Sequence, residues 1–143
     1  MLNNIFQIIV LIATGLIAGS TFYISLVEIY VRSLTSEKEQ LKNWKMVFPK
    51  ASGILKTFGV ITGVFILLTG YFTNNLLWYI SAIPLFILVP FTAIYIHKMN
   101  NELAVLEDYH DVIPKIQKWD KLHHIRTVLA ISAFIICVIA SVV

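Results

Sequence analysis

Long apolar stretches alternate with short charged ones along this chain. Residues 5–27, 57–96 and 127–143 contain no Asp, Glu, Lys or Arg. As a helix, the 23 residues 5–27 measure about 34 Å, enough to cross the roughly 30 Å hydrocarbon core of a bilayer. The pattern predicts an all-α protein, a four-transmembrane-helix bundle in one membrane domain, 1–143, arranged up-down-up-down with spans at about residues 5–31, 51–72, 76–97 and 123–143.

The connections between the predicted helices carry turn signals. Residues 73–75, Thr-Asn-Asn, are short enough to join the second and third helices as an antiparallel hairpin. Pro84 and Pro90 lie inside the third helix and predict a kink. Residues 98–113 are mildly amphipathic and are expected to form a short interfacial helical segment, after which Pro114 favours the start of the fourth helix.

The amino-acid composition indicates an integral membrane protein. It is 58% hydrophobic and only 13% charged, with a mean hydropathy of +0.81, which is too apolar for a soluble globular protein. A single cysteine, Cys137, excludes an intrachain disulfide and a cysteine-rich metal site. The basic segments fit anionic lipid headgroups, so the expected partner is the lipid bilayer, with no nucleic acid.

Charge is confined to one side of the predicted bundle. Every Lys and Arg falls within residues 32–56 or 98–126. By the positive-inside rule, the connectors 32–50 and 98–122 are cytoplasmic and both termini are exterior. We expect this orientation in a bacterial plasma membrane.

A stripe of small and polar residues runs along the first helix. Its members follow one another at spacings of 4, 3, 4 and 3, so they share one helical face that should meet protein rather than lipid. They are Thr14, Ala18, Thr21, Ser25 and Glu28. The stripe therefore ends on a carboxylate at the membrane boundary.

The fourth helix also has one distinct face, made by residues at spacings of 3 and 4. It comprises Ile116, Trp119, His123, Arg126 with Thr127, Ala130 and Phe134. His123 and Arg126 therefore project together at the membrane boundary, where ionisable groups indicate a functional site. The alternative is an aromatic and basic belt that only anchors the helix among headgroups.

Several polar residues fall at the same ends of three predicted helices. We expect Glu28, Asn100, His123 and Arg126 to line one pocket between the first, third and fourth helices. A structural alternative is an ion pair of Glu28, either with Arg32 at i, i+4 or with Arg126 across the bundle.

A metal ion is a second possibility for this pocket. Glu28, His97 and His123 would form a set of two histidines and one carboxylate, of the kind that holds non-haem iron. The spacing does not specify such a site, since the chain has no His-x-x-x-His or Glu-x-x-His motif here. The sequence leaves open whether the site takes no cofactor or a metal ion.

Four segments carry a resemblance to a known family. They are residues 19–28, 44–52, 89–92 leading to Asn100, and 119–127. In this order, and across about residues 14–135, the chain resembles the anthrone oxygenase-like membrane family, also described as DUF1772. Many relatives have His-Pro where this chain has Ile29 and Tyr30, and Met-Pro-Thr-Asn where it has residues 97–100.

The resemblance implies a four-helix membrane oxidoreductase that oxidises anthrones to anthraquinones without an organic cofactor. Its substrate would be a lipophilic phenolic or polycyclic molecule at the cytoplasmic leaflet. Glu28 or His123 would act as general base, and Arg126 with Asn100 would stabilise a developing phenolate or enolate. Supporting positions would be Trp119, Thr127 and His97. The competing hypothesis is a non-catalytic membrane carrier or assembly partner with a structural Glu/His/Arg cluster.

The topology is testable by thiol labelling. We expect Lys42→Cys and Lys118→Cys to resist an impermeant thiol reagent added outside intact cells, because both positions belong to connectors predicted to be cytoplasmic. Labelling of either cysteine from outside would contradict this orientation.

Overall fold

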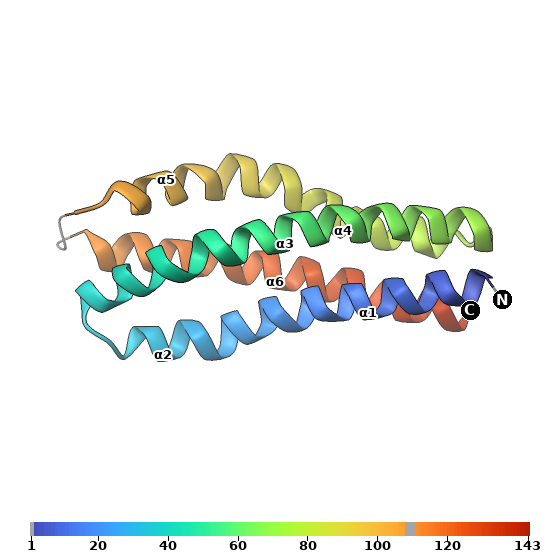
Figure 1. Cartoon of the computed structure of the whole chain (residues 1–143), viewed down its shortest axis with the longest axis horizontal. Coiled ribbons are helices and arrows are strands. Elements are labelled where there is room, and N and C mark those ends of the chain that lie inside the picture. The colour runs from blue at the N-terminus through green and yellow to red at the C-terminus, as the bar shows by residue number, and fades with distance from the viewer. Residues whose placement is uncertain (1, 108–110) are drawn as a thin grey trace.

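The structure, a computed structural model, describes residues 2–107 and 111–143, and every regular element in these residues is a helix. Four helical rods lie side by side and alternate in direction, with both termini at the same end (Figure 1). The rods are built, in chain order, from α1 (Leu2–Tyr23), the π-helix η1 (Ile24–Glu28) and α2 (Ile29–Ser33); α3 (Glu37–Thr73); α4 (Leu76–Phe91), the π-helix η2 (Thr92–Ile96) and α5 (His97–Val105); and α6 (Val112–Val142).

Four helices in the described residues are long and apolar enough to cross a membrane. They cover Asn3–Ser33, Glu37–Thr73, Leu76–Val105 and Val112–Val142. The fold class predicted from the sequence is confirmed, and the chain is an integral membrane protein by the length and composition of its helices.

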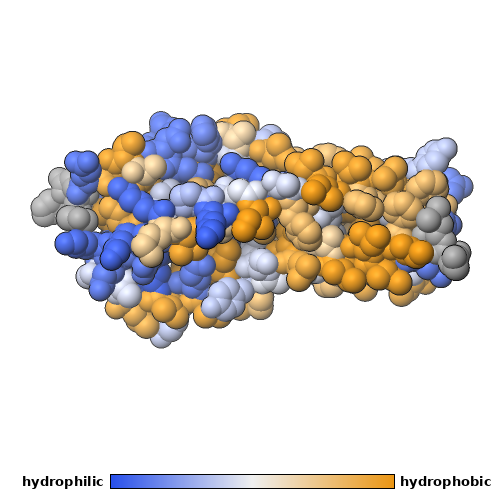
Figure 2. All heavy atoms as spheres, viewed as in Figure 1, coloured by the Kyte–Doolittle hydropathy of each residue, from blue (hydrophilic) through white to orange (hydrophobic). Residues whose placement is uncertain are grey.

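These helices are longer than a bilayer requires. The 37 residues of α3 measure about 55 Å, well beyond the roughly 30 Å hydrocarbon core. The extra length extends beyond the hydrocarbon core. Figure 2 shows that one half of the visible surface is hydrophobic and the other half is largely hydrophilic. We call the hydrophilic half, which carries residues 28–56 and 98–126, the charged end.

At the charged end, helix replaces most of the predicted connectors. The first connector, predicted as residues 32–50, comprises only residues 34–36, because α2 ends at Ser33 and α3 begins at Glu37. The predicted interfacial segment is α5, which continues the third helix. Residues 108–110 of that segment lie outside the described residues.

Short polar side chains define where the helices begin and end. Ser36 and Glu39 form a reciprocal capping box at the start of α3, with the Ser36 hydroxyl 2.7 Å from the Glu39 carboxylate. Asn74 adopts a left-handed conformation (φ 51°) that ends α3, as asparagine tolerates better than most residues. Asn75 then accepts a hydrogen bond from the Leu77 backbone N–H and starts α4. These three caps explain the tightness of the turns.

The two prolines of the third helix lie within α4, and the π-helix η2 begins two residues after Pro90. Proline cannot donate a backbone hydrogen bond and crowds the preceding turn. In Figure 1 the third rod curves where α4 passes into α5. The predicted kink is therefore present, and it changes the direction of the segment that carries Asn100.

The interior differs between the two halves of the bundle. In the apolar half, Thr14, Ala18, Thr21 and Ser25 are all buried, which confirms the stripe predicted for the first helix. The Thr14 hydroxyl donates to the Val10 carbonyl at 2.7 Å, so its polarity is satisfied within its own helix. At the charged end the core is larger and more aromatic, with Leu41, Trp44, Ile96, Met99, Leu103, Val112, Ile116 and Trp119.

The buried stripe yields a stability prediction. Ala18→Phe should destabilise the bundle by about 1–3 kcal/mol, because the larger ring has no room at a buried position. Leu16→Phe is the matched control, since Leu16 is exposed on the outer face of the same helix. Equal melting temperatures of the two variants in detergent would show that the stripe meets lipid.

Candidate functional site

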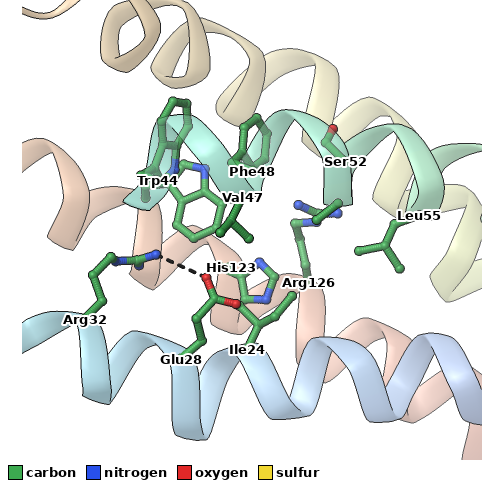
Figure 3. Close-up of a pocket in the computed structure, with 12 residues that line it drawn as sticks. Ile24, Glu28, Arg32, Trp44, Val47, Phe48, Ser52, Leu55, His123 and Arg126 are labelled. Carbon is green, nitrogen blue, oxygen red and sulfur yellow. Dashed lines mark ion pairs between the residues drawn. The ribbon is translucent and has the colours of Figure 1, made fainter. Parts of the chain in front are cut away.

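A small cavity lies at the charged end, between the first, second and fourth rods. Its volume is about 20 Å³, room for a single water-sized molecule. We call it the polar pocket (Figure 3). Its lining residues are Ile24, Glu28 and Arg32 from η1 and α2; Trp44, Val47, Phe48, Ala51, Ser52 and Leu55 from α3; and Trp119, His123 and Arg126 from α6.

His123 is the most deeply buried ionisable side chain of the pocket. It is 2% exposed, and neither of its ring nitrogens has a hydrogen-bond partner among the described residues. Its ring stacks on Trp119, with the ring centroids 5.2 Å apart. A buried polar atom without a partner costs about 1–3 kcal/mol, so such a group indicates a place that a ligand or water completes.

Hydrogen bonds of Thr127, one helical turn after His123, hold the segment of α6 that carries His123. Thr127 lies on the same face of α6, and its hydroxyl is 2.7 Å from the Ser25 hydroxyl and 3.1 Å from the Thr21 carbonyl. These buried hydrogen bonds tie α6 to the first rod. Thr127, a supporting residue in the sequence prediction, thus holds the helix that carries His123.

Arg32 organises the charged groups beside the pocket. It is 4% exposed, and its guanidinium pairs with Asp120 on α6 and, at 3.6 Å, with Glu28 on its own rod. Of the two ion pairs considered for Glu28, the structure forms the one with Arg32. Asp120 was not identified as a site residue from the sequence, although its spacing to His123 and Thr127 places it near their face of α6.

Arg126 differs from Arg32 in having no carboxylate partner. The ion pairs within residues 2–107 and 111–143 are Arg32–Glu28 and Arg32–Asp120, and Arg126 takes part in neither. Its side chain lines the pocket and extends toward Ser52 of α3 in Figure 3. One arginine is therefore neutralised by two carboxylates, while the other keeps its positive charge available.

Aromatic rings form one wall of the pocket. Trp119 meets Phe48 edge to face at 5.5 Å and Trp44 at 6.2 Å, and Trp44 stacks on Phe48 at 4.7 Å. The Arg32 guanidinium lies 5.5 Å from the Trp119 ring, within the range of a cation–π contact. Trp44 and Phe48 are four residues apart, so both lie on one face of α3, the face that turns inward here.

Asn100 does not line the pocket, contrary to the expectation from the sequence. Its side-chain oxygen accepts a hydrogen bond of 3.1 Å from the Trp119 indole, so it lies behind the aromatic wall. The predicted pocket used the first, third and fourth helices, whereas the observed one uses the first, second and fourth. The reason is that Trp44 and Phe48 of α3 fill the space that the sequence assigned to the third helix.

His97 is exposed and does not line the pocket, so the candidate metal ligands Glu28, His97 and His123 do not converge. Its nearest recorded polar contact is Asn101, 3.4 Å away. No group of three His, Cys, Asp or Glu residues with metal-binding geometry occurs in the described part of the chain. A supporting role for His97 stays a prediction, since it lies outside the polar pocket.

The pocket thus combines a buried imidazole, an unpaired guanidinium, a carboxylate and an aromatic wall beside an apolar bundle. Residues 44–136 of the chain match the family model described as anthrone oxygenase. This stretch contains Trp44, Trp119, His123 and Arg126 but not Glu28. Comparisons with curated proteins and with solved structures gave no match.

The ion-pair network yields a prediction about stability. Arg32→Met should destabilise the bundle by about 3–5 kcal/mol, because it leaves two carboxylates near the interior without their cation. Adding Asp120→Asn to that variant should recover part of the loss. Lys42→Met, at an exposed position of α3, is the control and should change little. A melting temperature for Arg32→Met equal to that of the control would contradict the network.

Proposed function

Since this chain belongs to the anthrone oxygenase family, we propose that it is a membrane-embedded oxidoreductase. Its substrate is a lipophilic phenolic or polycyclic molecule such as an anthrone, and its oxidant is O₂. The reaction takes place in the polar pocket, at the leaflet that faces the cytoplasm. The observation that carries this proposal is the buried imidazole of His123, whose two nitrogens have no partner among the described residues.

The chemistry that such a pocket has to support follows from the substrate. The methylene carbon of an anthrone loses two hydrogens and gains one oxygen atom of O₂, while the second oxygen leaves as water. This four-electron oxidation of carbon is matched by the four-electron reduction of O₂. Removal of the acidic methylene proton produces an electron-rich anion, which reacts with O₂ more readily than the neutral molecule. The protein therefore has to take a proton and stabilise an oxyanion.

His123 is the residue best placed to take the proton. A general base needs a free nitrogen within hydrogen-bond reach of the substrate, and His123 presents one to the pocket. Glu28 lines the same pocket and provides a negative charge beside the imidazolium that results. Because Glu28 already pairs with Arg32, we assign it the electrostatic role and His123 the role of base.

Arg126 is the residue best placed to stabilise the oxyanion. Its guanidinium carries a full positive charge that no carboxylate of the described residues neutralises. A fixed cation in a site of low water content stabilises developing negative charge strongly, because little solvent has to reorganise. The assignment of Arg126 follows the sequence prediction. Asn100, by contrast, accepts a hydrogen bond from the Trp119 indole and does not line the pocket.

Access for a polycyclic substrate requires side chains to move, since the cavity holds only a water-sized molecule. Ile24 lines the polar pocket and also one end of a shallow lipid-facing groove of about 480 Å³ along the first rod, beside Gly15, Gly19 and Tyr23. A lipophilic molecule dissolved in the bilayer would follow this groove and pass Ile24 to reach His123.

A non-catalytic carrier or assembly partner is the second candidate. The observed Glu28–Arg32–Asp120 network favours it, because those charges also have a purely structural use. Turnover separates the two candidates, since a carrier binds an anthrone without oxidising it.

The proposal predicts a specific effect of His123. In lipid nanodiscs, the wild-type protein should convert 1,8-dihydroxyanthrone to the anthraquinone faster than protein-free nanodiscs do. His123→Asn should lower this rate by about 100-fold, since general bases typically contribute at least that much. The readouts are the absorbance of the anthraquinone and the consumption of O₂.

His124→Asn is the matched control, because His124 is the next residue but is exposed. It should keep the wild-type rate. A His123→Asn protein that folds and retains full activity would contradict the assigned base, and a wild-type rate equal to that of protein-free nanodiscs would favour the carrier. Metal analysis of the active preparation separates a metal-dependent from a metal-free reaction.

A further inference from the structure

Trp44 is the most unusual polar group of the aromatic wall. Its side chain is 2% exposed, it lines the polar pocket, and its indole nitrogen has no hydrogen-bond partner in the described part of the chain. An indole N–H only donates hydrogen bonds. Buried donors in folded proteins nearly always have an acceptor. An acceptor for Trp44 has to come from outside the described residues, and Trp44, unlike the similarly unpartnered Trp78, lines a pocket that an acceptor can enter.

The neighbouring charges define that acceptor further. Arg126 lines the same pocket, and its guanidinium donors have no carboxylate partner among the described residues. The Nε atom of Arg32 is also buried and lacks a partner among the residues that the structure describes. These donors belong to one pocket, in which Arg32 is already paired with Glu28 and Asp120, whereas Arg126 is a cation without a carboxylate partner among the described residues. An anionic oxygen matches them better than a neutral one, because hydrogen bonds to charged acceptors are about twice as strong.

The aromatic side chains that line the pocket indicate what kind of molecule carries the anionic oxygen. Trp44 stacks on Phe48, and both meet Trp119 at nearly right angles, with interplanar angles of 87° and 84°. Flat aromatic molecules pack against such rings face to face or edge to face. Because the cavity itself holds only a water-sized molecule, a planar aromatic body reaches these rings after side chains move, with its oxygen toward the donors.

We infer that the polar pocket holds the ionised form of its substrate, an aromatic phenolate or enolate left after proton removal, whose charged oxygen accepts hydrogen bonds from the Trp44 indole and from Arg126. This inference rests on the proposed function and names the ionisation state of its substrate. Trp44 has the oxyanion-stabilising role that the sequence analysis assigned to Asn100. It supplies a neutral, rigid donor, and Arg126 supplies the charge.

Trp78 provides a matched control for Trp44. It is 0% exposed, and its indole nitrogen likewise has no partner within the described residues. It belongs to the core of the apolar half, with Val10 and Ile66, and does not line the polar pocket. Removing either indole N–H leaves a buried ring, but only the change at Trp44 should alter binding of an oxyanion.

The test uses 2-hydroxyanthraquinone, a planar phenol that changes colour when it ionises. The probe is titrated with base in nanodiscs that contain the full chain and in protein-free nanodiscs. Binding to the wild-type protein should lower the pH of half-ionisation by at least one unit, a tenfold shift in the equilibrium. Trp44→Phe should reverse part of that shift, and Arg126→Gln should reverse more of it. Trp78→Phe should leave it unchanged.

Each outcome decides the inference. It is overturned if the probe does not bind the wild type, if binding leaves the midpoint unchanged, or if Trp44→Phe and Trp78→Phe behave alike. Should Trp44→Phe fail to fold, Arg126→Gln decides, because an unchanged midpoint in that variant also overturns it. Turnover of 1,8-dihydroxyanthrone is measured in the same samples. A shifted midpoint without turnover contradicts the proposed function alone, whereas turnover with an unshifted midpoint contradicts this inference alone.

Discussion

The burial of Arg32 is the constraint on which the charged end depends. A guanidinium removed from water has to be paired, and Arg32 achieves this with Asp120 on the fourth rod and Glu28 on its own. The pair with Asp120 fixes how α6 lies against the first rod. In that register Thr127 meets Ser25 and Thr21, and His123 faces the pocket. Because both carboxylates pair with Arg32, Arg126 has no carboxylate partner among the described residues.

The location of the pocket follows from the division of the bundle into two halves. The apolar half packs through small residues, and its hydroxyls are satisfied within their own helices, as that of Thr14 is by Val10, or between rods, as in the Ser25–Thr127 pair. The charged end contains larger aromatic side chains and ion pairs. The pocket lies where the two meet, so it has apolar helix surface on one side and the charged residues on the other.

The sequence predicts much of this arrangement because helical periodicity is strong in long helices. It predicts four helices, the buried stripe from Thr14 to Ser25, and a common pocket for Glu28, His123 and Arg126. Three features of the structure are not predicted from the sequence. The spacing of Trp44 and Phe48 suits a membrane interface as well as an inward face, the proline kink alters the position of Asn100 beyond what spacing predicts, and the Arg32–Asp120 pair depends on the register between helices distant in sequence.

The central claim is that the free imidazole of His123 is where the substrate meets the protein. The most direct measurement is the ¹⁵N NMR spectrum of histidine-labelled protein in nanodiscs, with and without 2-hydroxyanthraquinone, with His123 assigned by comparison with His123→Asn. The account predicts that the ligand shifts the ring nitrogens of His123 and leaves those of exposed His97 and His124 in place. An unchanged His123 signal with the ligand bound, or equal shifts of His97, His123 and His124, would contradict it.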